Sequence, residues 1–451
     1  MVIQIRGGFY IESSLPRFIS KLRYWGMIQI SSFETYCKDN SPSETVKQHV
    51  KQTVADIKQQ VVSKGDQAII DYTQQFDAPS ASLDDLKLRV APATIEQAYS
   101  QVTTEFLTAL KTAKSNIEAF HNHQLPDSWE KQAPNGYLYG MQYAPIRIAG
   151  LYVPGGRALY PSSVLMNAIP AKIAKVDTLV MTTPPQKNGQ IAPELLVAAK
   201  ECGIDIIIKA GGAQAIFGLA YGTDSIPAVD KIVGPGNAYV DVAKQMVYGK
   251  VDIDKPAGPS EVLVYIEDVK YAKFAAAELL AQCEHDPDAS AIALADDHII
   301  LEAIQQQVKL QLPQLKRQAV LEKSLKNCVL YKVKNRDQAI DAINTIASEH
   351  LCLLVDDHQV MRPKIRYAGA IFCGPYTPVA LGDYVAGPNH VLPTNRAARF
   401  SSALSVMDFM TFSSHLTCSK DDLMALDQTV NVLTAVEKLD AHYKSIKQRL
   451  N

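Results

Sequence analysis

The chain has 451 residues, of which 47% are hydrophobic and 20% are charged, so it can bury a large core and is not a disordered protein. Its 45 Lys and Arg residues against 47 Asp and Glu residues give a formal net charge of −2. This balance gives no support to binding of nucleic acid or of anionic membranes, which would need a basic surface. The length predicts about three domains at roughly 150 residues each.

The N-terminal residues and the cysteines bear on where the protein works. Residues 1–26 lack the apolar segment of a signal peptide and the periodicity of the chain that follows. We therefore treat residues 1–26 as a weakly determined part of an extension over 1–40, with Met27 as an alternative start. Seven scattered cysteines without a CxxC pair predict reduced thiols in a cytoplasmic compartment. No apolar run reaches the ~18 residues of a membrane span.

Helical periodicity begins near Ser43 and continues to Gly65, a typical helix terminator. A second long helical stretch is expected from about Thr94 to Phe120. Periodicity alone predicts that both stretches form a packed helical layer. The apolar side chains of the first stretch are Val46, Val50, Val54, Ile57 and Val61.

After Pro145 the pattern changes to short β-rich runs separated by helical stretches, which predicts βαβ units and a mainly parallel sheet. The first four strands are expected at 146–153, 178–182, 205–209 and 231–233. After Pro259 the alternation resumes, with strands at 261–266, 291–294, 328–333, 351–355 and 370–372. The chain therefore resembles two α/β halves, followed by a helical tail from about Asp421.

Glycine and proline mark the first of these halves as rich in ligand loops. Of the 23 Gly and 24 Pro residues, 24 lie between Ala144 and Pro259. Three loops here follow a strand and precede a helix, and their backbone N–H groups suit an anionic ligand. Neither the loop at 153–157 nor the loop at 234–237 is a dinucleotide fingerprint, and in the latter Tyr239 stands where the third glycine would be. A single loop of this kind is better explained as a tight turn, whereas three favour a ligand.

Two groups of residues carry chemistry. Gln282 and His285 lie three residues apart on one helix face, where a polar helix terminus is the simpler interpretation. With Asp383 and a second histidine they would form a mixed nitrogen and oxygen site suited to Zn²⁺. His442 is expected in the tail helix, five residues after Glu437, which places the two side chains about 140° apart, so they are not a chelating pair.

Glu349 and His350 stand at the start of an apolar strand, where they suit proton abstraction near neutral pH. Adjacent strand residues point to opposite faces, so direct pairing would require a bend. A surface or helix-capping histidine is the alternative interpretation. Cys283 is better explained as an inert, partly buried thiol than as a nucleophile.

Taken together, a series of motifs resembles the L-histidinol dehydrogenase family in order and spacing from about Ser43 to the C-terminus. The motifs are LYVPGGR at 151–157, PSSVLMNAIPAK at 161–172, GGAQAI at 211–216, VGPGNA at 233–238, PAGPSEV at 256–262, EHDPD at 284–288, SEHL at 348–351, GDY at 382–384 and GPNHVLPT at 387–394.

The resemblance implies NAD-dependent oxidation of L-histidinol through L-histidinal to L-histidine, the last two steps of histidine biosynthesis. It implies that His350 takes the alcohol proton and that Glu349 activates the water that adds to the aldehyde. One Zn²⁺ per subunit would be held by Gln282, His285, Asp383 and His442. The implied substrate contacts are Ser260, Gln282, His285, His350, Asp383, His390, Glu437 and His442. The implied cofactor contacts are Tyr152, Gln214 and Asn237.

The resemblance also implies an architecture of two Rossmann-like α/β domains, similar to aldehyde dehydrogenases, with an N-terminal helical layer and a C-terminal helical tail. The expected zinc and acid/base domain comprises 41–144 and 259–400, the NAD domain 145–258, and the tail 401–451. A homodimer is implied in which the tail completes the partner's site. Val385 replaces a cysteine common in bacterial members, without touching an implied catalytic position.

Other functions remain open at this point. One alternative is a related NAD- and zinc-dependent enzyme that acts on another primary alcohol, such as a sulfopropanediol. This alternative is less favoured, because the carboxylate of Glu437 suits a cationic imidazole-amine substrate better than an anionic sulfonate. A zinc hydrolase that does not use NAD is also less favoured, because it would not explain the glycine-rich loops between strands and helices. An inert scaffold is least favoured, because every implied active position carries the expected residue type.

Overall fold

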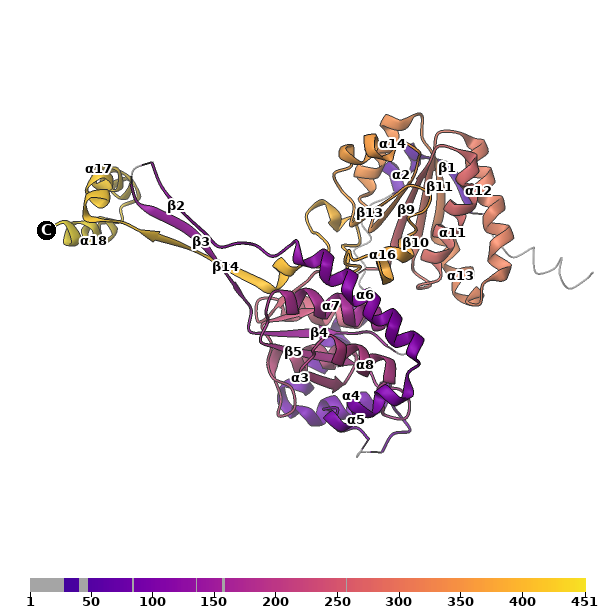
Figure 1. Ribbon diagram of the computed structural model, residues 1–451, viewed down its shortest axis with the longest axis horizontal. Coiled ribbons are helices and arrows are strands. Elements are labelled where there is room, and N and C mark those ends of the chain that lie inside the picture. Colours follow the sequence, from indigo (N-terminus) through magenta and orange to yellow (C-terminus); the bar gives the residue numbers. More distant parts are fainter. Residues whose placement is uncertain (1–27, 40–47, 83–84, 135, 156–158, 257) are drawn as a thin grey trace, which may run out of the picture. The chain divides into compact units, whose positions relative to one another are not determined.

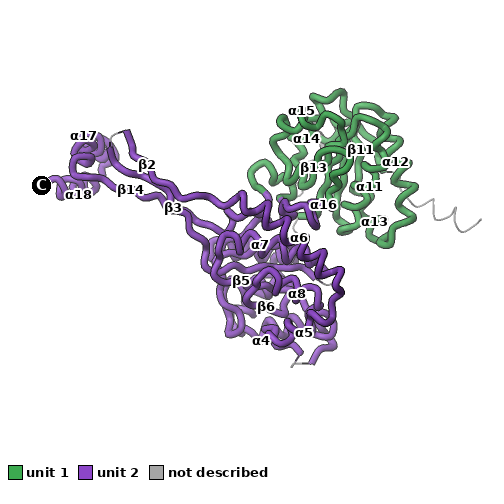
Figure 2. Tube along the Cα trace, viewed as in Figure 1, with its two compact units in different colours: residues 1–44, 258–379, 393–402 green, residues 45–257, 380–392, 403–451 purple. Residues whose placement is uncertain are grey.

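A computed structural model describes residues 28–39, 48–82, 85–134, 136–155, 159–256 and 258–451. Contacts between Cα atoms divide the chain into two compact units, coloured in Figure 2. Unit 1 comprises 1–44, 258–379 and 393–402, and unit 2 comprises 45–257, 380–392 and 403–451. This division differs from the expected one, because residues 45–144 group with 145–257 and not with the zinc and acid/base half.

Unit 1 is built on a six-stranded sheet in which every described pair of neighbours is parallel. Strand β1 lies within the expected N-terminal extension, which therefore contributes an edge strand and helix α2 (Phe33–Asp39) to the fold. The strand order is β1 (Gln29–Ser32), β11 (Cys328–Lys332), β10 (Ser290–Ala295), β9 (Glu261–Ile266), β12 (His350–Leu354) and β13 (Ala370–Cys373).

Helices cover both faces of this sheet (Figure 1), so unit 1 has three layers. Side chains of β9 alternate between the layers: Val262 and Val264 pack with α11 (Ala272–Cys283) and α12 (His298–Gln311). Leu263 and Tyr265 pack with α2 and with α14 (Arg336–Ile346). Burial on both faces explains the nearly continuous apolar runs in the sequence. Shorter helices are α13 (Gln318–Ser324), α15 (His358–Met361) and α16 (Val379–Tyr384), of which α16 passes from unit 1 into unit 2.

Unit 2 contains a second parallel sheet with helices on both faces. Its order is β6 (Ile206–Lys209), β5 (Thr178–Thr183), β4 (Ile148–Tyr152), β7 (Lys231–Val233) and β8 (Asp252–Ile253). Strand order reverses between β4 and β7, and ligands of open α/β sheets bind outside the carboxyl ends of strands at such a reversal. The expected fold of two Rossmann-like α/β units is confirmed.

The helices that pack on the parallel sheet of unit 2 belong to two separate cores. One core contains α6 (Thr104–Asn122), α7 (Pro161–Ile173) and α8 (Pro193–Glu201) against one face of the sheet. The other contains α3 (Gln48–Lys64), α4 (Asp66–Phe76), α9 (Gly212–Tyr221) and α10 (Ala238–Val247). The expected N-terminal helical layer is thus an integral part of unit 2.

The helical stretch expected between Thr94 and Phe120 is interrupted. Helix α5 (Pro92–Ala98) and a short 3₁₀ turn are followed by extended backbone at Val102. Thr103 then caps α6, its hydroxyl oxygen accepting a hydrogen bond from Phe106 N at 3.1 Å. Such a cap satisfies a backbone donor that has no partner within the helix.

The C-terminal tail is not purely helical. Strand β14 (Met410–Thr417) forms an antiparallel sheet with β3 (Leu138–Pro145) and β2 (Trp129–Gln132), which the sequence analysis did not anticipate. Helices α17 (Lys420–Glu437) and α18 (Asp440–Leu450) follow (Figure 1). Lys438 breaks them apart with a positive φ of 60°. The expectation of one helix through Glu437 and His442, with its angle of 140°, is therefore wrong. None of the helices in the described part of the chain is long and apolar enough to cross a membrane.

Candidate active site

Glu349 and His350 lie together in unit 1, at the beginning of β12. Glu349 Oε2 is 3.6 Å from His350 Nδ1, and the two residues are only 6% and 5% exposed. The expected conflict of strand geometry does not arise, because β12 begins at His350 and Glu349 precedes it. The structure therefore brings the proposed acid/base pair together.

The main chain of Glu261 holds both members of this pair. Glu261 N donates to Glu349 Oε2 at 2.8 Å, and His350 Nδ1 is 3.0 Å from Glu261 O. A carbonyl oxygen only accepts, so Nδ1 carries the proton in this hydrogen bond. The nitrogen of His350 that can take up a further proton is therefore Nε2.

The side chain of Glu261 ties the same strand to the segment 393–402. Its Oε1 accepts a hydrogen bond from Asn395 N at 3.1 Å, and Gly258 N donates to Thr394 Oγ1 at 2.7 Å. Burial raises the pKa of Glu261, while the backbone donor at Asn395 acts in the opposite direction. Ser260 was expected to contact the substrate, but its neighbour Glu261 was not predicted, because a main-chain anchor leaves no signal in the residue type.

Gln282 lies in the last turn of α11 in unit 1, whereas His285 lies two residues beyond the end of this helix, which is shorter than expected. Gln282 is buried, and its amide nitrogen has no hydrogen-bond partner among the described residues. The oxygen and nitrogen of such an amide are interchangeable in assignment, so this orphaned position is compatible with a metal ligand. His285 is exposed, and Ser260 is partly buried in the loop before β9.

Asp383 and His390 lie together in unit 2. His390 Nδ1 is 2.8 Å from Asp383 O, and its Nε2 is 3.4 Å from Ser163 Oγ. The preceding residue, Asn389, is buried and donates to Met166 O at 2.7 Å. The Asn389 anchor and the Ser163 contact were not predicted as functional, although both lie within quoted motifs.

Glu437 and His442 are exposed at the end of α17 and near the beginning of α18. The four expected zinc ligands are thus divided, with Gln282 and His285 in unit 1 and Asp383 and His442 in unit 2. Within the described ranges, no group of three or more His, Cys, Asp or Glu residues is placed to hold a metal ion. The ligand set remains a prediction.

The expected cofactor residues lie on the loops and helices at the carboxyl edge of the sheet in unit 2. Tyr152 ends β4, and its hydroxyl oxygen accepts a hydrogen bond from Gly212 N at 3.2 Å. Burial raises the pKa of Tyr152 to about 12, so it stays a phenol. Gln214 is buried in the first turn of α9. Asn237 caps α10, its side-chain oxygen accepting from Tyr239 N and Val240 N.

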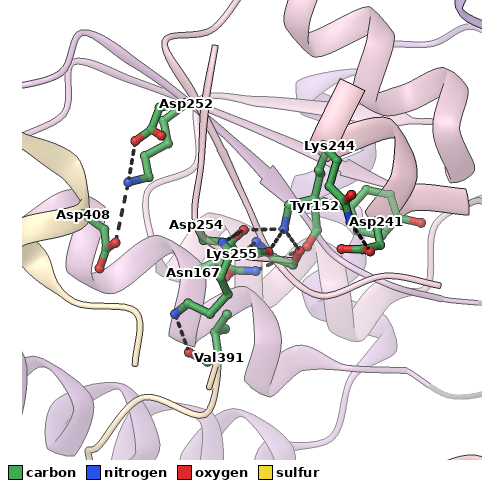
Figure 3. Close-up of polar contacts among 12 residues, drawn as sticks. Tyr152, Asn167, Asp241, Lys244, Asp252, Asp254, Lys255, Val391 and Asp408 are labelled. Atoms are coloured by element: carbon green, nitrogen blue, oxygen red, sulfur yellow. Dashed lines mark hydrogen bonds and ion pairs between the residues drawn. The ribbon is translucent and has the colours of Figure 1, made fainter. Parts of the chain in front are cut away.

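A buried ion pair fixes the loop between β7 and α10 (Figure 3). Lys244 Nζ pairs with the Asp254 carboxylate, and both side chains are 1% exposed. Asp254 Oδ2 accepts from Gly234 N at 2.8 Å, and Lys244 donates to Gly234 O at 2.9 Å. Gly234 has a φ of 116°, and a Cβ there would lie 2.0 Å from Tyr152 O. Only glycine fits this position.

Lys255 extends the network from the cofactor side of unit 2 to the segment that carries His390. Its Nζ donates to Val391 O at 3.2 Å (Figure 3). Burial lowers the pKa of Lys255. Lys255 thus helps to hold the backbone next to His390, a proposed substrate contact.

Comparison with known proteins identifies similar sequences and a similar structure. The family model described as histidinol dehydrogenase matches residues 40–450. The histidinol dehydrogenase of Synechococcus sp. is 46% identical over 402 residues, covering 89% of this chain and 92% of the relative. That of Pseudomonas putida is 45% identical over 403 residues, covering 89% and 91%. The crystal structure of histidinol dehydrogenase from Elizabethkingia anophelis matches with a TM-score of 0.89 at 34% identity, covering 94% of this chain and 98% of that one.

We predict that Lys244→Met lowers the free energy of unfolding by about 3 to 5 kcal/mol, because it leaves the Asp254 charge buried without its partner. Chemical denaturation followed by circular dichroism measures this change. Lys444→Met is the control, because it removes an exposed i,i+4 pair with Asp440 and should have little effect. A loss no larger than that of the control contradicts the prediction.

Proposed function

The chain belongs to the histidinol dehydrogenase family, an oxidoreductase family, and on that premise we propose that it oxidises L-histidinol through L-histidinal to L-histidine with NAD⁺ and Zn²⁺. The observation that carries the proposal is the buried pair of Glu349 and His350, 3.6 Å apart and anchored on the main chain of one residue, Glu261. A base and a carboxylate so placed suit an alcohol oxidation followed by hydration of an aldehyde.

His350 removes the proton of the substrate hydroxyl. Its Nδ1 is committed to Glu261 O, so Nε2 takes the proton and the imidazole plane is fixed by the main chain. When bound, NAD⁺ supplies the acceptor for the hydride that leaves the same carbon. A neutral histidine near pH 7 is the side chain best matched to this transfer.

Glu349 activates the water that adds to the aldehyde. The carboxylate is held by Glu261 N through Oε2, which keeps it oriented while it accepts a proton from water. The resulting hydrate carries a hydroxyl and a C–H bond on one carbon, so His350 can serve the second oxidation as it served the first. One anchored pair thus accounts for both oxidation steps.

Zinc would be held by Gln282, His285, Asp383 and His442, a set of nitrogen and oxygen donors that suits this metal. When bound, it would supply a fixed point of attachment for the imidazole and amino groups of the substrate. The buried amide of Gln282, without a partner among the described residues, supports this assignment. Ser260, His390 and Glu437 would contribute further substrate contacts.

Tyr152, Gln214 and Asn237 would bind NAD⁺ at the carboxyl edge of the sheet in unit 2. The loops they stand on suit a dinucleotide, because Gly211 and Gly212 permit close approach to the backbone at the beginning of α9. The reversal of strand order between β4 and β7 supports the same location.

We also propose a homodimer in which the tail reaches the partner's site. Helices α17 and α18 contain no buried residue, and the large apolar side chains Leu433 and Val436 are 57% and 77% exposed. Exposed apolar surface of this kind marks an interaction site. Cys202, Cys283, Cys328, Cys373 and Cys418 are free thiols, which supports the expected cytoplasmic compartment.

The purified enzyme should form about two NADH per L-histidinol and release histidine, since each oxidation transfers one hydride. Absorbance at the NADH band and chromatography of the product measure this ratio, with metal analysis of the same sample. Chelation of the metal should abolish turnover, and added Zn²⁺ should restore it. One NADH per substrate, accumulation of aldehyde, or no turnover contradicts the proposal.

His350→Asn should reduce kcat by roughly 10²- to 10⁴-fold, because it removes general-base assistance, and should change KM far less and leave the zinc content unchanged. Steady-state kinetics and metal analysis measure the effects. His298→Asn is the matched control, since His298 is exposed on α12 of the same unit. Parallel loss of zinc and activity in His350→Asn would instead make His350 a ligand.

Mixing two inactive variants tests the shared site. Heterodimers of a His442→Ala subunit and a His350→Asn subunit should recover part of the activity, because one of their two sites keeps both intact side chains. Differently tagged subunits, purified through both tags, give the heterodimer for assay. No recovery in verified heterodimers argues for a site completed within one chain.

A further inference from the structure

The carboxylate of Asp77 lies at the edge of unit 2 where the proposed cofactor residues gather. Asp77 directly follows helix α4, which packs on α9 so closely that a Cβ on Gly218 would lie 2.8 Å from Ile69 Cδ1. At the other end of this contact, a Cβ on Gly211 would lie 3.3 Å from Asp77 Oδ2. The packing of two helices thus holds the carboxylate against the loop that begins α9.

The protein does little to offset the cost of burying the Asp77 carboxylate. Its Oδ2 atom is buried and accepts no hydrogen bond from any residue that the structure describes. Burial raises the pKa of Asp77 to about 6. At neutral pH the group is therefore mostly ionised and poorly solvated, and it would gain from hydrogen-bond donors supplied by a ligand.

The strand end next to this loop presents a further polar group. The Tyr152 hydroxyl uses its oxygen to accept from Gly212 N, which leaves its proton to be donated. A ligand bearing several hydroxyl groups would donate to the carboxylate and accept from the Tyr152 phenol.

We propose that Asp77 binds the 2′- and 3′-hydroxyls of the adenosine ribose of NAD⁺ and thereby selects NAD⁺ over NADP⁺. Two adjacent neutral hydroxyls donate to a carboxylate, whereas a 2′-phosphate would bring negative charge against it. Acidic side chains bind this ribose in other dinucleotide-binding α/β domains. Here the carboxylate comes from a helix that precedes the sheet in the chain. The inference rests on the proposed use of NAD⁺.

Direct binding measurements on the purified full-length protein test this role apart from catalysis. Calorimetric Kd values for NAD⁺, ADP-ribose and NADP⁺ are compared between wild type and Asp77→Asn. We expect NAD⁺ and ADP-ribose to bind about 10- to 100-fold more weakly to the variant, the range for loss of hydrogen bonds to a charged group. NADP⁺ should bind the variant no more weakly than it binds the wild type, so the variant should show a smaller preference for NAD⁺ over NADP⁺.

Asp71→Asn is the matched control, because Asp71 is an exposed carboxylate on helix α4, which Asp77 directly follows. It should leave all three affinities and the melting temperature unchanged. Should Asp77→Asn fail to fold, Asp77→Ser is measured in its place with the same expectation.

Three results would overturn the inference: unchanged affinities in the Asp77 variant, weakening of NAD⁺ without weakening of ADP-ribose, and equal weakening of all three ligands. The second would assign the carboxylate to the nicotinamide half, and the third to structure. Wild-type protein that binds neither NAD⁺ nor ADP-ribose would overturn the proposed cofactor as well. Ligand binding by the wild type therefore distinguishes a failure of the proposed cofactor from a failure of the proposed role of Asp77.

Discussion

The buried ion pair between Lys244 and Asp254 is the interaction on which the ligand edge of unit 2 depends. Removing two charges from water is costly, and the cost is offset here because the pair also binds both backbone groups of Gly234. Gly234 in turn lies against the end of β4, where a Cβ would meet Tyr152 O. The pair therefore sets the distance between two loops of the proposed cofactor site, and neither loop can shift alone.

The proposed catalytic groups are oriented by main-chain atoms. His350 points Nδ1 at Glu261 O, and His390 points Nδ1 at Asp383 O. In each case a carbonyl determines which ring nitrogen carries the proton. The hydrogen bond to a carbonyl does not require any particular side chain on Glu261, so it can persist after substitutions at Glu261 as long as the strand keeps its register.

Much of the fold could be predicted from periodicity, since the strands of both parallel sheets are short apolar runs bounded by turns. Strand β1 escaped prediction because its four residues, Gln29–Ser32, carry one aliphatic side chain and pair only at a sheet edge. The break at Thr103 and the positive φ of Lys438 depend on tertiary packing and backbone conformation. Motifs named the candidate site residues, whereas the Glu261 anchor and the Asp77 carboxylate depend on segments distant in sequence.

The tail has a consequence for how the protein responds to dilution. Helices α17 and α18 bury no residue within one chain, and the side-chain contacts between them are the polar ones of Asp427 with Tyr443 and Lys447. Most helical stability in proteins comes from the packing of an apolar face, which these two helices lack within one chain. If the tail is stabilised by the partner subunit in the proposed dimer, the fraction of ordered tails depends on the protein concentration and decreases as the subunits dissociate. Each α/β unit keeps its own core at any concentration. Catalytic competence would then be lost at low enzyme concentration while the bulk of the molecule remains folded.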